Sequence, residues 1–388
     1  MLMRIAINAW FWGSPTTGSG QYTRQLVEAL SSLDAAENLD LQVVLVLPSH
    51  VPDNVEGRSS EFPSPIKVHP VDSGRSNLGK VWFEQRAFPR ACTDVGAEIA
   101  HVPYWAPPAR MPMPLVVTIH DVIPLVLRAY RGGPHQRLYT KLVGATARGA
   151  NLILTDSEAS RRDILARLGL PGERVRTIPL AVDGRYTHEP TVGDQDIRTR
   201  YDLPEAYVLY LGGFDRRKNL TTVVETYRWA GPVIGDAFPL VIAGCLPDAD
   251  TAFTPDPRRL VQEQNIDDGV VRFCGFVDED HKPALYRGAV GFIFPSRYEG
   301  FGLPPLEAMA CGTPVVGSHV ASLLEIVGDG GVLFRPDDAK GMADVLIRLA
   351  LDEGFRTQLS RRAVAQAAKF SWEKTARSTL AAYRDALG

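Results

Sequence analysis

Two glutamates lie eight residues apart in the segment YEGFGLPPLEAMACG, residues 298–312. A carboxylate accepts two hydrogen bonds side by side, which suits the neighbouring hydroxyls of a sugar or a ribose. Glu299 precedes a glycine-containing loop and Glu307 follows it, so both side chains can face one site. The simpler interpretation is an ordinary turn with solvated glutamates. The coincidence of paired glutamates, glycines and prolines favours a binding site.

The loop between the two glutamates joins an expected buried strand, ending at Ser296, to a helix expected from Pro304. Gly300 and Gly302 permit unusual backbone angles and close approach of a ligand. Prolines suit the first turn of a helix, where their missing N–H groups are not needed. The start of this helix is predicted to face an anion such as a diphosphate.

A basic run, LGGFDRRKNL at residues 211–220, follows the strand that is expected to open the second domain. Arg217 offers a planar fork and Lys218 a point charge, and both groups bind phosphate. On their own, adjacent basic residues are more simply explained as a solvated loop.

Two further features lie in the first half of the chain. Gly18 and Gly20 belong to a turn, residues 14–26, whose backbone N–H groups are expected to approach phosphate oxygens. This turn lacks the third glycine of a dinucleotide fingerprint, because Thr23 occupies that position. His120 ends the buried run VVTIH, although a lone histidine is often a core residue.

Short β-branched runs alternate with amphipathic ones along the whole chain, which predicts an α/β fold built on parallel sheets. We expect two doubly wound, Rossmann-like domains facing each other across a deep cleft, with ligands at the carboxyl ends of the strands. The expected divisions are an acceptor-side domain at 1–185, a nucleotide-sugar-binding domain at 186–370, and a final helix at 371–388 that crosses back to the first domain.

Composition excludes several classes of function. The net charge of −3, with basic residues spread along the chain, argues against nucleic acid as a partner. The four cysteines form no CxxC pair, so we expect neither a disulfide framework nor a zinc site. No leader or membrane span is evident, which predicts a cytoplasmic protein.

The spaced glutamates closely resemble the Glu-x7-Glu signature of the family-4 (group 1) retaining glycosyltransferases, which have the GT-B fold. The resemblance extends over nearly the whole chain. It implies that Glu307 binds the nucleotide ribose and that Glu299 contacts the hydroxyls of the donor sugar. The backbone of the intervening loop is implied to help; its residues are Gly300, Phe301, Gly302 and Leu303.

The resemblance also assigns the other features. Arg217 and Lys218 are implied to neutralise the diphosphate leaving group. Many relatives carry arginine where this chain has Gly213, and the RKN form resembles the mannosyltransferase-like branch. His120 is implied to approach the donor sugar. Two glycine-containing places are implied to line the donor: the loop of Gly18 and Gly20, and the end of the run VVRFCGF, at Gly275 and Phe276.

The function implied is a retaining, metal-independent hexosyltransferase of surface polysaccharide or glycoconjugate synthesis. Its donor is expected to be a nucleotide sugar, first GDP-mannose and alternatively UDP-glucose or UDP-GlcNAc, with no cofactor. The alternatives are another GT-B activity such as an epimerase or a phosphorylase, a non-catalytic sugar-nucleotide-binding subunit, and a dinucleotide oxidoreductase.

The acceptor is expected to be a glycan or a lipid-linked sugar, with peripheral contact at the inner face of a membrane. One helix candidate carries aromatic and basic residues that would suit a lipid-linked acceptor or a bilayer surface. An ordinary helix that faces the core is the alternative. These residues are Trp82, Phe83, Arg86, Phe88 and Arg90.

Overall fold

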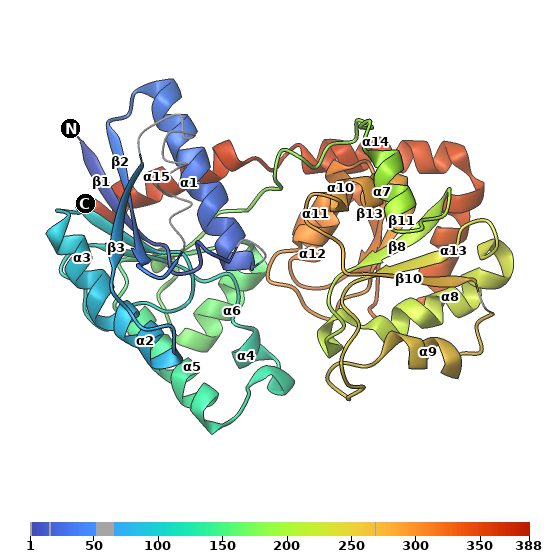
Figure 1. The fold of residues 1–388 in the computed structure, drawn as a ribbon, viewed down its shortest axis with the longest axis horizontal. Coiled ribbons are helices and arrows are strands. Elements are labelled where there is room, and N and C mark those ends of the chain that lie inside the picture. The colour runs from blue at the N-terminus through green and yellow to red at the C-terminus, as the bar shows by residue number, and fades with distance from the viewer. Residues whose placement is uncertain (1, 15–16, 52–65, 268) are drawn as a thin grey trace. The chain divides into compact units, whose positions relative to one another are not determined.

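The computed structural model describes residues 2–14, 17–51, 66–267 and 269–388. The chain forms two compact units (Figure 1). Unit 1 comprises Met1–Leu180 together with Ser371–Gly388, and unit 2 comprises Ala181–Phe370. Pro15 and Thr16, within the predicted glycine turn, lie outside the described residues.

Unit 1 is built on a seven-stranded sheet in the order β3-β2-β1-β4-β5-β6-β7, with every pairing parallel. The central strands are continuously buried, because helices cover both faces of a parallel sheet of this kind. The strands are β1 (Met3–Asn8), β2 (Leu41–Pro48), β3 (Ile66–Val71), β4 (Ile99–Val102), β5 (Leu115–Thr118), β6 (Leu152–Thr155) and β7 (Val175–Thr177).

The helices of unit 1 come from both ends of the chain. The last helix, α15, packs beside α1, and an ion pair of 2.5 Å joins Arg377 to Glu37 (Figure 1). The helices are α1 (Gly18–Glu37), α2 (Asn77–Trp82), a π-helical turn (Phe83–Ala87), α3 (Phe88–Asp94), α4 (Ile123–Val126), α5 (Pro134–Ala147), α6 (Glu158–Leu168) and α15 (Trp372–Leu387).

Unit 2 is built on a six-stranded parallel sheet in the order β10-β9-β8-β11-β12-β13. Its core contains large side chains such as Tyr210, Tyr227 and Phe292, all fully buried. The strands are β8 (Tyr207–Leu211), β9 (Leu240–Ala243), β10 (Val271–Gly275), β11 (Ala289–Phe294), β12 (Val315–Ser318) and β13 (Gly331–Phe334).

Among the helices of unit 2, α8 lies beside α13, and α10 lies beside α11 (Figure 1). The helices are α7 (Asp194–Arg200), α8 (Leu220–Ile234), α9 (Pro257–Glu263), α10 (Lys282–Gly288), α11 (Leu303–Ala310), α12 (Leu323–Val327), α13 (Ala339–Leu351) and α14 (Glu353–Ala367).

The prediction of two parallel-sheet, Rossmann-like halves is confirmed. Two predicted boundaries were displaced: α1 begins at Gly18, inside the segment predicted as a glycine turn, and β11 ends at Phe294 rather than Ser296. Two edge strands, β7 and β13, were not predicted. They have three and four residues, too few for their periodicity to stand out from the surrounding loops.

Candidate active site

The strand order reverses between β8 and β11 in unit 2, and the predicted cations and the first glutamate follow these two strands. β8 and β11 are adjacent and parallel, so their carboxyl ends lie at the same edge of the sheet. Arg217 and Lys218 follow β8, and Glu299 follows β11. A reversal of strand order in a doubly wound sheet opens a crevice where ligands bind.

The structure brings these three side chains into direct contact. Arg217 Nη1 donates to Glu299 Oε2 at 2.5 Å, and Lys218 Nζ donates to Glu299 Oε1 at 2.9 Å. Arg217 also donates to the carbonyl of Tyr298 at 3.1 Å, and Lys218 Nζ lies 4.8 Å from the ring centroid of Phe294. Each carboxylate oxygen therefore has one cation, and both cations are held in fixed positions.

The charge of Glu299 is stabilised by this arrangement. Burial alone would raise the pKa of Glu299, but the charges and hydrogen bonds of Lys218 and Arg217 outweigh burial and lower it. The glutamate is 7% exposed, so few waters screen these interactions. The result is an ionised glutamate that can accept a hydroxyl hydrogen bond, beside two cations suited to phosphate.

Glu307, on α11, has the opposite environment. It is 9% exposed, and Tyr286 donates its hydroxyl to Glu307 Oε2 at 2.9 Å. Burial raises the pKa of Glu307, although Lys282 and Tyr286 act in the other direction. A nearby second tyrosine, Tyr186, has its ring centroid 6.1 Å from that of Tyr286.

The loop between the glutamates is fixed by a serine from a later turn. The hydroxyl of Ser322 donates to the carbonyl of Glu299 at 3.0 Å and to that of Phe301 at 2.5 Å. Gly302 has φ of +122°, and a Cβ built there would lie 2.9 Å from a methyl carbon of Leu323. This position therefore requires glycine for both its dihedral angle and its packing.

The start of α11 offers fewer amide donors than a typical helix start. Leu303 is its first residue, and Pro304 and Pro305 follow without N–H groups. The N–H of Leu306 donates to the carbonyl of Gly302 at 3.2 Å, within the helix itself. Backbone N–H groups that contact a ligand would therefore come from the loop before α11 rather than from its first turn.

Gly275 and Phe276 lie at the end of β10, two strands from β8 in the same sheet. Gly275 has φ of +72°, and its carbonyl accepts the N–H of Gly244 at 2.8 Å. The ring of Phe276 is 58% exposed. An exposed aromatic ring beside a strand end is a suitable contact for a flat base.

In unit 1, Gly18 and Gly20 form the first turn of α1 rather than a separate loop. Thr17 caps this helix, and its hydroxyl accepts the N–H of Gly20 at 3.2 Å. A Cβ at Gly20 would lie 2.1 Å from the carbonyl oxygen of Ser14, whereas one at Gly18 meets nothing within 4 Å. Gly20 is thus required by packing, while Gly18 leaves the helix start accessible.

His120 follows β5 and is paired with the buried carboxylate of Asp156, which follows the neighbouring strand β6. Its Nδ1 donates to Asp156 Oδ2 at 2.8 Å, and the ring of Tyr22 lies edge-on at 4.8 Å. Burial would lower the pKa of His120, but Asp156 outweighs this effect and raises it. Asp156 therefore stabilises the imidazolium form relative to a histidine without a charged partner, and that form carries a second N–H at Nε2.

A second histidine lies beneath the first in a chain of buried hydrogen bonds. His101 Nδ1 contacts the hydroxyl of Tyr383 at 2.7 Å, and its Nε2 contacts that of Thr118 at 2.8 Å. Thr118 in turn contacts the hydroxyl of Tyr22 at 3.0 Å. Burial lowers the pKa of His101 to about 3, so this ring is neutral.

The sequence interpretation did not pair Asp156 with His120, and it named neither Tyr286 nor Ser322. Asp156 belongs to the motif TDSEAS, which directly follows β6, and its place at the end of a strand adjacent to β5 is a usable signal. Tyr286 and Ser322 carry no such signal, because they lie within an ordinary helix and turn.

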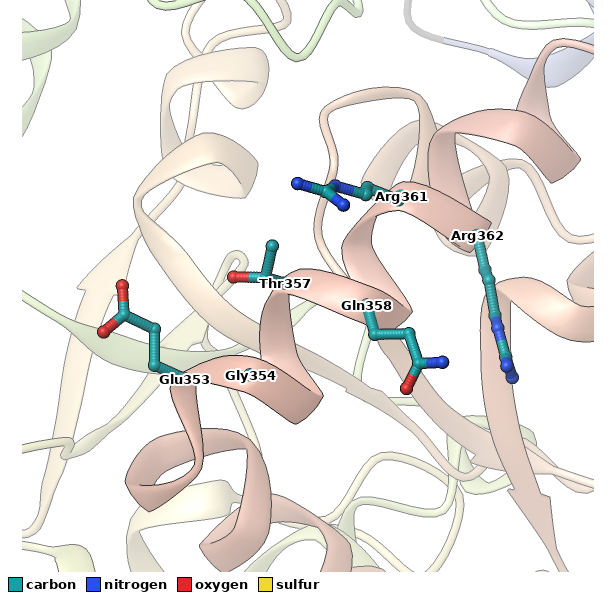
Figure 2. Close-up of a pocket in the computed structure, with 6 residues that line it drawn as sticks. All are labelled: Glu353, Gly354, Thr357, Gln358, Arg361 and Arg362. Atoms are coloured by element: carbon teal, nitrogen blue, oxygen red, sulfur yellow. The ribbon is translucent and has the colours of Figure 1, made fainter.

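A separate shallow pocket lies along α14 (Figure 2). None of the predicted site residues lines it, and its lining comes from that one helix: Glu353, Gly354, Thr357, Gln358, Arg361 and Arg362. Within the described residues, no group of three or more His, Cys, Asp or Glu side chains is placed to hold a metal ion. In the same part of the chain, none of the helices combines the length and apolar character that crossing a membrane requires.

Sequence comparisons identify the family. Residues 194–366 match the glycosyl transferases group 1, and residues 16–185 match glycosyltransferase family 4. O-antigen chain mannosyltransferase B of Escherichia coli is 30% identical over 386 residues, which cover 95% of this chain and 96% of the relative. The chain therefore belongs to the family-4, group 1 glycosyltransferases, as the Glu-x7-Glu resemblance predicted.

Other relatives cover less of the chain. The serotype-specific mannosyltransferase WbdA of Escherichia coli is 30% identical over 70% of this chain and 33% of its own length. A D-inositol 3-phosphate glycosyltransferase of Acidothermus cellulolyticus is 30% identical over 75% of this chain and 67% of its own.

Solved structures support the fold. Sucrose-phosphate synthase from Thermosynechococcus elongatus superposes with a TM-score of 0.72 at 24% identity, covering 99% of this chain and 98% of that one. An Anabaena protein in complex with UDP and glucose gives 0.70 at 15% identity, covering 98% and 99%. The fold is thus GT-B, the class predicted from the sequence.

Proposed function

We propose that this glycosyltransferase moves a hexose, first of all mannose from GDP-mannose, to a hydroxyl of a glycan or lipid-linked acceptor in surface polysaccharide synthesis. The full-length similarity to an O-antigen mannosyltransferase supports the choice of mannose. The observation that carries the donor class is the contact of Arg217, Lys218 and Glu299 where β8 and β11 end.

Each group of this cluster has a distinct part in the proposal. Arg217 and Lys218 bind the diphosphate and stabilise the negative charge that it gains as it leaves. Glu299 holds both cations in position and accepts a hydroxyl of the donor sugar. Glu307 accepts the ribose hydroxyls, and the exposed ring of Phe276 beside Gly275 contacts the base.

The reaction proposed retains the configuration of the anomeric carbon. The bond from that carbon to the diphosphate oxygen breaks, and the acceptor oxygen bonds to the carbon on the same face. The acceptor proton passes to the departing diphosphate, so the products are a glycoside and a nucleoside diphosphate. A double displacement would need a carboxylate against the anomeric carbon, and the two glutamates are assigned to hydroxyl binding.

The residues of unit 1 are proposed to act on the same donor. His120, held by Asp156 with a raised pKa, donates from Nε2 to an oxygen of the donor sugar. The open start of α1 at Gly18 offers backbone N–H groups to phosphate oxygens. The proposed charge stabilisation comes from protein groups, so we expect transfer to persist when EDTA is present.

The test is a thermal-shift panel of GDP, UDP, ADP and their sugars, followed by transfer assays. A ligand that binds the folded state raises the melting temperature by mass action. GDP and GDP-mannose should give the largest shifts, and GDP release should require an acceptor. Larger shifts with UDP sugars would reassign the donor, and binding without turnover on any acceptor would indicate a non-catalytic subunit. No shift with any nucleotide would refute the proposal.

A further inference from the structure

Helix α5 of unit 1 exposes large apolar side chains that the fold does not cover. Leu138 is 68% exposed and Leu142 is 50% exposed. Residues four apart lie on the same side of a helix, so the two form one exposed strip. Val143 and Ala147 are buried on the other side and anchor α5 to its unit. The core therefore covers one face of α5 and leaves apolar side chains exposed on the other face.

The segment of α2 and α3 repeats this pattern. Leu78 is 82% exposed and Trp82 is 49% exposed, while Phe83 and Phe88 are fully buried. From the sequence, this segment was expected either to contact a bilayer or a lipid-linked acceptor, or to face the core. The exposures assign the two expectations to different faces. Phe83 and Phe88 face the core, and Trp82 lies on the surface.

The two helical segments are neighbours. The hydroxyl of Tyr139 on α5 donates to Glu84 Oε2 in the π-helical turn at 3.5 Å, and Figure 1 shows α2 and α5 close together. We call the exposed residues of these segments the α2–α5 surface. It consists of Leu78, Trp82, Arg86, Arg90, Arg137, Leu138, Lys141 and Leu142.

The charge around this surface is basic in a chain that is acidic overall. The chain has 45 acidic residues among 388, yet none occurs between Asp121 and Asp156. Five exposed basic residues lie in that interval: Arg128, Arg131, Arg137, Lys141 and Arg148. Between residues 73 and 93 the single acid is Glu84, which is buried and lies 3.6 Å from Lys80 Nζ.

We propose that the α2–α5 surface docks on the face of a lipid bilayer that contains anionic phospholipids. Exposed leucine and tryptophan side chains enter the head-group region of a bilayer, and flanking basic side chains pair with its phosphates. A second copy of the chain fits less well, since it would bring one basic surface against another. Asp94, whose carboxylate lies 3.9 Å from Arg90 Nε, is an exposed acid at the edge of this surface.

The test measures cosedimentation of the full chain with vesicles, in the absence of donor and acceptor. We expect binding to vesicles of phosphatidylcholine with phosphatidylglycerol, weaker binding to phosphatidylcholine alone, and weaker binding at high salt. Arg137→Gln with Lys141→Gln should lower the partition coefficient by about fivefold per charge removed. Leu138→Gln with Leu142→Gln should lower it at least as much.

A matched control lies on α8 of unit 2, where Trp229 and Val233 are also four apart and are 53% and 58% exposed. Trp229→Gln with Val233→Gln should leave vesicle binding unchanged. Melting temperatures of all variants establish that each one folds. Failure of the wild type to bind anionic vesicles would overturn the proposal, as would equal loss in the α8 control. Concentration-dependent self-association that the Leu138 and Leu142 variant abolishes, without vesicle binding, would assign the surface to a second copy instead.

Docking does not depend on the proposed transfer reaction, and the two can fail separately. Transfer to a water-soluble acceptor should be unchanged in the α2–α5 variants, because none of their residues lies in the proposed site. Loss of vesicle binding with intact transfer therefore concerns the surface alone.

Discussion

Each unit holds two residues of one type in opposite electrostatic environments. In unit 2, the pKa of Glu299 is lowered because two cations outweigh burial, whereas the pKa of Glu307 is raised because burial prevails. In unit 1, the pKa of His120 is raised by Asp156, whereas that of His101 is lowered to about 3 by burial. In each pair, the residue that has a charged partner lies in the loop that follows a sheet strand.

The difference shows how one side-chain type serves two purposes. Glu299 and His120 each have an oppositely charged partner, which favours the charged form of the side chain. Glu307 and His101 are instead hydrogen-bonded to tyrosine hydroxyls, which carry no charge. A buried charge is stable only when it is paired, so the partner rather than the residue type decides the role.

The largest expected effect comes from removing a cation beside Glu299. Arg217→Gln should lower kcat about 100- to 1000-fold, since it removes a fixed donor from the leaving group. It should also lower stability, because Glu299 loses a charged partner. The matched control is Arg216→Gln, whose side chain is exposed next to Arg217 in sequence. Similar kcat losses in both variants would contradict the assignment.

Substitutions of the two glutamates should differ in their effects on GDP binding and on kcat. Glu307→Gln should weaken GDP binding about tenfold by titration calorimetry, since a neutral amide is a poorer acceptor for two ribose hydroxyls. Glu299→Gln should leave GDP binding closer to that of the wild type and lower kcat more. Unimpaired activity in both variants would remove these residues from the site.

The pH dependence of transfer tests the histidine pair. Since Asp156 raises the pKa of His120, Asp156→Asn should lower it and move the basic limb of the kcat profile to lower pH. The stabilisation from this pair is present below the ordinary histidine pKa and is lost as pH rises through the folded value. Asp121→Asn, which removes a more weakly acting charge, should shift the limb less. Equal shifts would show that Asp156 raises the pKa of His120 no more than Asp121 does.

The pH dependence of stability in Glu307→Gln tests the raised pKa of this carboxyl. Between the ordinary glutamate pKa and the raised one, the native state binds more protons, so stability falls as pH rises. Removing the carboxyl should therefore raise the free energy of unfolding near neutral pH, and the gain should vanish in acid. Denaturant titrations at both pH values measure it. A loss of stability at neutral pH would mean that the carboxylate is better solvated than its burial implies.

The last prediction concerns stability alone and lies in the loop that separates the glutamates. Gly302→Ala should destabilise unit 2 by about 1–2 kcal/mol, because alanine disfavours φ of +122° and its methyl group would contact Leu323. Gly184→Ala, at a position with no neighbour within 4 Å, is the control and should be near neutral by thermal unfolding. Equal melting temperatures would show that the loop accepts a side chain.

The amino-acid sequence alone determined the fold class and most of the elements. Short β-branched runs predicted β1 to β6 and β8 to β12, and several of these runs are continuously apolar because a strand covered on both faces excludes polar residues. The Glu-x7-Glu segment and the RKN run predicted the residues that meet at the β8 and β11 ends. These signals are local, so a single chain displays them.

Only the tertiary structure decided which partner each buried charge has. Arg217 and Glu299 are 82 residues apart, and the pairing of β8 with β11 brings them together. The pairing of β5 with β6 likewise places Asp156 beside His120. Burial and pairing depend on such long-range neighbours, so the opposite pKa shifts of two glutamates in one motif could not be read from their spacing.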